Sequence, residues 1–447
     1  MTLDGKKPRA RRTLPFSFFG RVKAGLKQSS GLAAKRTVHR VADPARQVVD
    51  YFVSERRTVR QGFVAVSVAA TTSLIAGLTL AGMSGRMEAI RGLFVLIPVS
   101  IGMRGNIFGA LAARLGTSVH TGLFEVSRDK QGILYQNVYA AALLTLATSA
   151  VMGVMARAIA GLLGIRTVSL WDFVVIALVG GVLSSAIVLA VTVYLSVESF
   201  RRGWDLDSVG APLITAIGDV VTLPCLLLAT YLAGRGLVTP ILGGVALAAG
   251  CASLAHGYTT GNTFARRLVR ESFPVLCVAI VLDVLAGAVV QPRADDILHK
   301  WPAITIVVPG FLEITGALGG ILAARLGSKL HLGVVSARAR PDAIVLLDAS
   351  ILLVLGVTVY ALISSATLAL AELLNQAHPG ALRFLGLVMF GGLLATVVAA
   401  VIGYYAAAAT YRLHLDPDNQ TIPLVTSGMD LLGAICLVLA LVVFGVA

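Results

Sequence analysis

Long apolar segments follow one another along the chain from residue 62 onward, separated by short polar loops. A helix needs about 20 apolar residues to cross a bilayer, and most of the segments reach this length. They lack the strict alternation of a barrel strand, and only helices satisfy their own backbone groups in lipid. The pattern therefore predicts an all-α polytopic membrane protein. The expected transmembrane helices, about eleven in number, are 62–83, 89–112, 136–164, 171–197, 212–234, 237–256, 273–291, 302–325, 343–373, 383–411 and 421–446.

The chain also repeats itself with an offset of about 211 residues. The segment at 97–122 matches 308–333, with the block LAARLG in both, and RRTVRQGF at 56–63 returns as RRLVRESF at 266–273. Each copy holds five predicted spans, so two copies joined directly would face opposite ways across the membrane. The additional span at 237–256 restores the direction, which predicts parallel repeats about a pseudo-two-fold axis along the membrane normal.

This organisation predicts four parts of the chain. They are a basic tail with a juxtamembrane amphipathic helix (1–55), a first five-helix repeat (56–234), a linking transmembrane helix and loop (235–265) and a second five-helix repeat (266–447). Composition agrees with a membrane protein, because 57% of the residues are hydrophobic, 13% are charged and the mean hydropathy is +0.85.

The formal charge of +14 is concentrated at the amino terminus, where residues 1–60 hold fifteen Lys and Arg against four Asp and Glu. A basic segment next to a span is typical of a cytoplasmic tail that contacts anionic lipid. No nucleic-acid recognition motif accompanies the charge, so no nucleic-acid partner is expected. We expect a multi-pass protein of the cell membrane, with its amino terminus in the cytoplasm and its carboxyl terminus outside.

The most informative segment is DLDSVGAPLITAIGD at 205–219, which recurs as DPDNQTIPLVTSGMD at 416–430. A lone charge at the bilayer centre costs roughly 2.5 to 3.5 kcal/mol on insertion scales. Because Asp219 and Asp430 occupy the same register of the fifth span, they predict a functional pair. Two carboxylates that face one axis repel each other unless a cation lies between them, and a divalent cation with oxygen ligands meets this requirement.

Other oxygen-bearing side chains are expected near this pair. Thr215 and Thr426 lie one turn before the two aspartates on the same face, although bonding to their own helix explains them equally well. Asn106 on the second span can accept a hydrogen bond from water bound to the ion, whereas Ala317 takes its place in the second copy. Glu313 is expected to supply the polar group that the second copy otherwise lacks.

Acidic residues outside this group are harder to assign. Asp207 and Asp418, with Asp205 and Asp416, are expected to gather cations at the inner ends of the fifth spans, although ordinary solvated loop carboxylates would look the same. Asp283 and Asp348 lie within apolar runs, where each suits a second-ion site, a proton site or a partner of an intramembrane Arg. Arg104 is a candidate partner for Glu313. His120 and His331, at the inner ends of the second spans, are interpreted as structural.

The pattern PxxxTxxxD on the fifth span resembles the fifth helix of the MgtE magnesium-transporter superfamily. PVSIGMRGNIFGALAARLGT is similar to the second-helix block of the eukaryotic solute carrier family 41 type, which fuses two MgtE domains. The resemblance covers about 56–447. It implies a divalent-cation pathway between two five-helix bundles, with Asp219 and Asp430 as the central ligands. Asn106 matches the second-helix Asn of the family, and Ala317 departs from it.

We therefore expect a transporter or channel for divalent cations, with magnesium as the transported ion, no resident cofactor and no enzymatic activity. The pathway lies within a pseudo-dimer formed by one chain, so a monomer would suffice. A P-loop, an HExxH motif and a nucleophile elbow are absent from the sequence, which argues against an ATP-driven pump or a hydrolase. Two alternatives stay open: a sodium- or proton-coupled carrier of another substrate, and a membrane scaffold without transport activity.

Overall fold

Eleven helices among the described residues are long and apolar enough to cross a membrane, as the hydrophobic pattern predicts. The computed structural model describes residues 50–446, apart from 128, 203–205, 294–299 and 414–419. Residues 1–55 form a unit of their own; the expected amphipathic helix there is described only in part, with residues 50–54 helical. The remaining residues, from Arg56 onward, form the second unit, which holds all the spans.

The first repeat contains α3 (Arg56–Gly82), a second span divided into several pieces, α7 (Ile133–Leu162), α8 (Leu170–Arg202) and α9 (Leu206–Thr230). The pieces of the second span are η1 (Leu93–Val95), α5 (Leu96–Arg104), the π-helical turn η2 (Gly105–Gly109) and α6 (Ala110–His120). A short helix, α4 (Ser84–Ala89), precedes them, and the linking helix α10 (Val238–Thr259) follows the repeat.

The second repeat has the same order of helices. It contains α11 (Thr263–Val290), α13 (Pro302–His331), α14 (Ala343–Leu373), α15 (Ala381–Leu413) and α16 (Ile422–Val443), with a single 3-10 turn, η3 (Gln291–Arg293), after α11. Its second span, α13, is one continuous α-helix, so the π-helical turn of the first repeat has no counterpart there. All the spans are helical, and two repeated halves make up the membrane part of the chain.

The second span of each repeat extends beyond its apolar run and ends at a histidine, His120 or His331. The apolar run is shorter because each LAARLG block contains an arginine. In the first repeat, Arg114 Nε donates to Asn137 Oδ1 on α7 at 3.0 Å. The aliphatic residues around this arginine keep their helical spacing, so the helix continues through the polar position.

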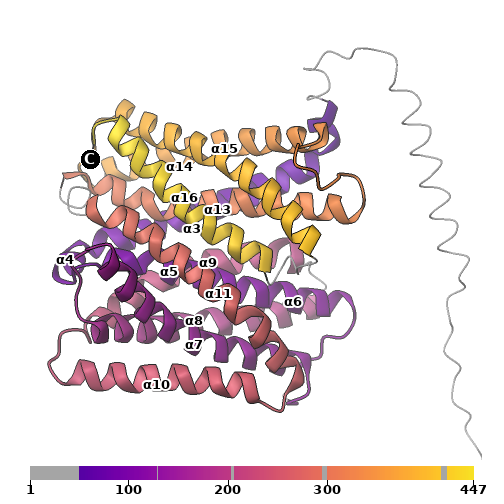
Figure 1. Ribbon diagram of the computed structural model, residues 1–447. Helices are drawn as coiled ribbons and strands as arrows, with labels where there is room; N and C mark the ends of the chain where they lie inside the picture. Colours follow the sequence, from indigo (N-terminus) through magenta and orange to yellow (C-terminus); the bar gives the residue numbers. More distant parts are fainter. Residues whose placement is uncertain (1–49, 128, 203–205, 294–299, 414–419, 447) are drawn as a thin grey trace, which may run out of the picture. The chain divides into compact units, whose positions relative to one another are not determined.

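The linking helix α10 lies at the edge of the bundle, against α7 and α8 of the first repeat (Figure 1). Ser253 Oγ donates to the carbonyl oxygen of Leu143 at 3.0 Å, and a Cβ on Gly250 would lie 2.3 Å from Ala150 Cβ. Its other face is exposed apolar surface, which suits a helix that borders lipid. Cys251 lies on this exposed side.

The first helix of each repeat packs against the other repeat. Helix α3 lies against α13 and α14 as well as α9, and α11 lies against α5 and α7 as well as α16. Equivalent glycines permit both crossings. A Cβ on Gly77 would lie 1.9 Å from the carbonyl oxygen of Ile306, and a Cβ on Gly287 would lie 2.8 Å from that of Phe94. This exchange of first helices joins the two repeats into one bundle.

Candidate functional site

A cavity of about 480 Å3 lies between the two repeats. Its walls come from α3, the second span and α9 of the first repeat, and from α13 and α16 of the second. None of the described residues that line it is Lys or Arg. Six of the eight ligands expected from the sequence line this cavity, and they are Asn106, Thr215, Asp219, Glu313, Thr426 and Asp430.

The two fifth spans place Thr and Asp toward the cavity from opposite repeats. Thr215 and Asp219 are four residues apart on α9, as are Thr426 and Asp430 on α16, so each pair shares one face of its helix. Asp219 is only 2% exposed, and its Oδ2 has no hydrogen-bond partner among the described residues. An unpaired carboxylate in an apolar bundle is costly, which makes it a strong candidate for a cation ligand.

Glycines on the second spans let these side chains approach. A Cβ on Gly316 would lie 3.2 Å from Asp430 Oδ1, and a Cβ on Gly105 would lie 3.3 Å from Thr215 Cγ2. Both glycines line the cavity, with Gly109 and Gly320 one turn further along. The small residues therefore do more than permit helix packing, because larger side chains would fill the space beside the polar groups of the fifth spans.

Asn106 connects the two repeats across the cavity. Its Nδ2 donates to Ser427 Oγ at 3.3 Å, and its Oδ1 accepts from Thr426 Oγ1 at 3.2 Å. Both partners lie on α16 of the other repeat. The Thr426 hydroxyl also faces the carbonyl oxygen of Ile422 at 2.9 Å, so the two accounts of this threonine, a polar lining residue and a hydroxyl bonded to its own helix, are compatible. Asn106 lies within the π-helical turn, a feature often found at functional sites.

Glu313 and Asp283 add two carboxyl groups to the region. Glu313 lines the cavity and interacts electrostatically with both Asp219 and Asp430. Asp283 lies on α11 behind Gly102, with its side chain fully buried and both carboxylate oxygens without a hydrogen-bond partner among the described residues. From the sequence, Asp283 suits a second-ion site, a proton site or a partner of an intramembrane Arg equally well. Comparison of the two repeats singles out this position, because the first copy has a serine where the second copy has Asp283.

The structure separates Arg104 from Glu313. Arg104 lies inside the first repeat, where its Nη1 donates to the carbonyl oxygen of Gly181 at 2.7 Å and also to Ser185 Oγ. Both acceptors are on α8. Arg104 therefore contributes to helix packing in the first repeat, and the suggested ion pair with Glu313 is absent from the described part of the chain.

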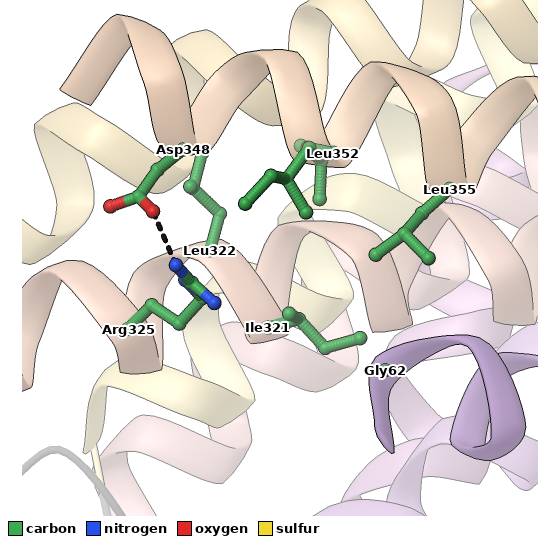
Figure 2. A pocket seen from close by; sticks show the side chains of 8 residues that line it. Gly62, Ile321, Leu322, Arg325, Asp348, Leu352 and Leu355 are labelled. Carbon is green, nitrogen blue, oxygen red and sulfur yellow. Dashed lines mark hydrogen bonds and ion pairs between the residues drawn. The ribbon is translucent and has the colours of Figure 1, made fainter. Parts of the chain in front are cut away.

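Asp348 is instead the partner of a basic pair on α13. Arg325 Nη2 lies 2.5 Å from Asp348 Oδ1, and Lys329 Nζ lies 2.7 Å from Asp348 Oδ2. Figure 2 shows the arginine and the carboxylate meeting between α13 and α14, beside apolar side chains such as Leu322. The gap beside this ion pair measures only about 10 Å3, too small for a ligand. Asp348 thus fits the interpretation as a partner of an intramembrane arginine.

The remaining candidates lie away from the cavity or outside the described residues. Asp205, Asp416 and Asp418 fall outside the described ranges, and for Asp207 only the backbone, in the first turn of α9, is described. The His331 Nδ1 lies 2.8 Å from the carbonyl oxygen of Gly327, and its ring packs edge-on against Tyr411. These contacts agree with a structural role for His331. The side chain of His120 is not among those described.

A family model described as MgtE, divalent cation transporter, matches residues 97–229 and 308–440. Each match begins in the second span and ends in the fifth, so Asp219 and Asp430 are included, whereas α3 and α11 are not.

Similar proteins are found in animals. Solute carrier family 41 member 3 of Rattus norvegicus is 24% identical over 377 residues, which cover 78% of this chain and 79% of the relative. Member 2 of the same family is 24% identical in Gallus gallus, over 76% of this chain and 62% of the relative, and 24% identical in Homo sapiens, over 78% and 63%. No solved structure matches the chain.

Proposed function

The chain belongs to the MgtE family of divalent cation transporters, and from this premise we propose that it moves magnesium ions through the cavity between its two repeats. Asp219 and Asp430 are the central ligands in this proposal. One observation carries it: two carboxylates occupy the same register of the two fifth spans and line one cavity whose described walls hold no Lys or Arg.

Electrostatics explains why these carboxylates need a cation. Two like charges 4 Å apart repel by roughly 4 kcal/mol at an effective dielectric constant of about 20. A divalent ion between Asp219 and Asp430 attracts both carboxylates and so overcomes this repulsion. It also neutralises their charge, which is costly in apolar surroundings. Both aspartates present hard oxygen ligands, which magnesium prefers.

The size of the cavity suits an ion that keeps its water. Six waters at about 30 Å3 each occupy roughly 180 Å3, and the cavity measures about 480 Å3. Among the described residues, no group of three or more His, Cys, Asp and Glu side chains is arranged to hold a metal ion directly. Few direct protein ligands and several waters are usual for magnesium. Asn106, Thr215 and Thr426 are then the groups that bind the water shell.

The charge distribution gives the proposed orientation. Because residues 1–60 are strongly basic, we place the amino terminus in the cytoplasm and, after eleven crossings, the carboxyl terminus outside the cell. The proposed pathway lies between repeats of one chain, so a monomer is sufficient for transport.

Replacing either central carboxylate tests the pathway. Asp219→Asn and Asp430→Asn keep the side-chain shape and remove the charge that binds the ion. We expect each change to lower magnesium flux into proteoliposomes by at least about tenfold, which corresponds to about 1.4 kcal/mol of lost binding. The readout is the initial rate of magnesium uptake at equal protein incorporation.

The exposed loop residue Asp129 offers a matched control, because Asp129→Asn makes the same chemical change outside the cavity. Flux in this variant should stay within twofold of the unmodified chain. Wild-type flux in both Asp219→Asn and Asp430→Asn would rule out the proposed pathway. Repeating the assay with imposed sodium or proton gradients separates passive flow from coupled transport, and a flux that requires another substrate would favour the alternative carrier.

A further inference from the structure

Two pairs of equivalent positions near the cavity differ between the repeats in a compensating way. The offset of the repeat pairs Ser73 with Asp283 on the first spans, and Gly102 with Glu313 on the second spans. In both pairs the acidic residue belongs to the second repeat. By sequence alone, the second repeat therefore carries two acidic residues that the first repeat lacks.

The exchange of first helices distributes these two acids over both sides of the cavity. On one side, Asp219 interacts electrostatically with Glu313, and Ser73 lies beside Asp219. On the other side, Asp430 interacts with Asp283, and it also interacts with Glu313 and with Asp219. We call the first group the Glu313 side and the second the Asp283 side. Each side has two carboxyl groups. One comes from a fifth span, and the other comes from a second span on the Glu313 side and from a first span on the Asp283 side.

Steric contacts differ between the two sides. A Cβ on Gly102 would lie 2.7 Å from Asp283 Oδ2, closer than real Cβ atoms come. A side chain at 102 would therefore displace the Asp283 carboxylate from its present position. On the Glu313 side the larger side chain, Glu313, is on the second span. Ser73, at the position equivalent to Asp283, is small. The chain thus keeps one additional carboxyl group on each side.

Asp283 has the properties expected of a cation ligand. Its side chain is fully buried, neither oxygen has a hydrogen-bond partner, and no ion pair reaches it among the described residues. The Ser427 hydroxyl, which also accepts a hydrogen bond from Asn106, interacts electrostatically with the Asp283 carboxyl group. A carboxylate with this degree of burial requires a compensating cation or a proton.

We propose that Asp283 and Ser427, together with Asp430, form a second cation subsite beside the central ion that Asp219 and Asp430 hold with Glu313, so that the cavity region binds two divalent cations. The charges balance, because four carboxylates carry the charge of two divalent ions. The oxygen ligands select a hard cation such as magnesium, calcium or manganese. This inference rests on the proposed function of the cavity as a cation pathway. The family match does not include it, since Asp283 lies outside both matched regions.

Manganese is a suitable probe because it accepts the same oxygen ligands and can be counted by its electron paramagnetic resonance. Equilibrium dialysis of the full chain in detergent should give two manganese ions bound per chain. Asp283→Asn should reduce the number to one, and Glu313→Gln should also reduce it to one. The control Asp129→Asn, in an exposed loop, should leave two.

The outcomes separate this inference from the proposed function. If the unmodified chain binds one ion and Asp283→Asn leaves that ion with the same affinity, the second subsite does not exist, while the proposed pathway stands. If the unmodified chain binds none, both fail. Should Asp283→Asn not fold, Ser427→Ala decides: it should weaken one of the two dissociation constants by roughly three- to tenfold, as expected for one lost ligand bond. Two unchanged dissociation constants in Ser427→Ala would overturn the subsite.

Discussion

At the residue scale, neighbouring positions differ together between the two repeats. Arg104 corresponds to Thr315, and Ser149 corresponds to Tyr360. In the second repeat the Thr315 and Tyr360 hydroxyl oxygens lie 2.6 Å apart. In the first repeat the large side chain is Arg104, which reaches Gly181, and its neighbour is the small Ser149. The larger side chain is on the second span in the first repeat and on the third span in the second repeat, and its chemistry differs. Such paired differences make the two halves of a duplicated fold unequal while both interiors stay packed.

Asn106 is the residue at which this inequality should be most visible in transport. Asn106→Ala removes its hydrogen bonds to Thr426 and Ser427, each worth about 0.5 to 1.5 kcal/mol, together with a polar group that faces the proposed hydrated ion. We expect magnesium flux in proteoliposomes to fall by roughly five- to tenfold.

The comparison for this prediction is Ala317→Gly, which trims the equivalent side chain of the second repeat, where no hydrogen bond can be lost. It should reduce flux less than Asn106→Ala does. Equal effects of the two substitutions would indicate that the second spans contribute symmetrically and that the bridge to α16 has no role in transport.

At the element scale, the crossings of α3 and α11 hold the bundle together. Each first helix inserts a glycine against the backbone of the opposite repeat's second span, Gly77 at Ile306 and Gly287 at Phe94 and Val95. No side chain separates the backbones at these points, so the helices come as close as they can. Small residues at such crossings are the main route to tight helix association in lipid, where there is little hydrophobic driving force between helices.

Adding side chains at these crossings should therefore destabilise the protein. Gly77→Val and Gly287→Val force the helices apart, and overpacking of this kind typically costs about 1 to 3 kcal/mol. We expect both variants to unfold at a lower temperature than the unmodified chain in detergent, as followed by intrinsic fluorescence or by loss of the monodisperse gel-filtration peak.

Gly244→Val is the matched control, because a Cβ at Gly244 on α10 would meet nothing within 4 Å. Its unfolding temperature should change little. If Gly77→Val unfolds at the same temperature as Gly244→Val, the close crossing of α3 and α13 is not present in the protein.

At the scale of the whole molecule, the repeat and the span count could be predicted from the sequence, because both are expressed in hydrophobic periodicity and in a fixed offset. The placement of Asp219 and Asp430 on one cavity followed from the same symmetry. The exchange of α3 and α11 could not be predicted, since it depends on contacts between spans that are far apart in the chain. For the same reason the sequence does not decide among the three roles open to Asp283, and the partners of Arg104 and Asp348 follow only from the packing of neighbouring helices.

The packing of each first helix against the opposite repeat predicts that the two halves of the chain stay associated after cleavage between them. A protease site inserted between Thr260 and Gly261 lies in the loop after α10 and leaves Asn262, which caps α11, in place. Cleavage separates the two repeats covalently, yet α3 also packs against α13 and α14 of the second repeat, and α11 against α5 and α7 of the first. We expect the two fragments to elute together from gel filtration in detergent and the cleaved protein to retain magnesium flux. The uncleaved insertion variant is the reference for both measurements. Fragments that separate under conditions in which this reference stays monodisperse would mean that each first helix packs within its own repeat, and the Asp283 side of the cavity could not then form as described.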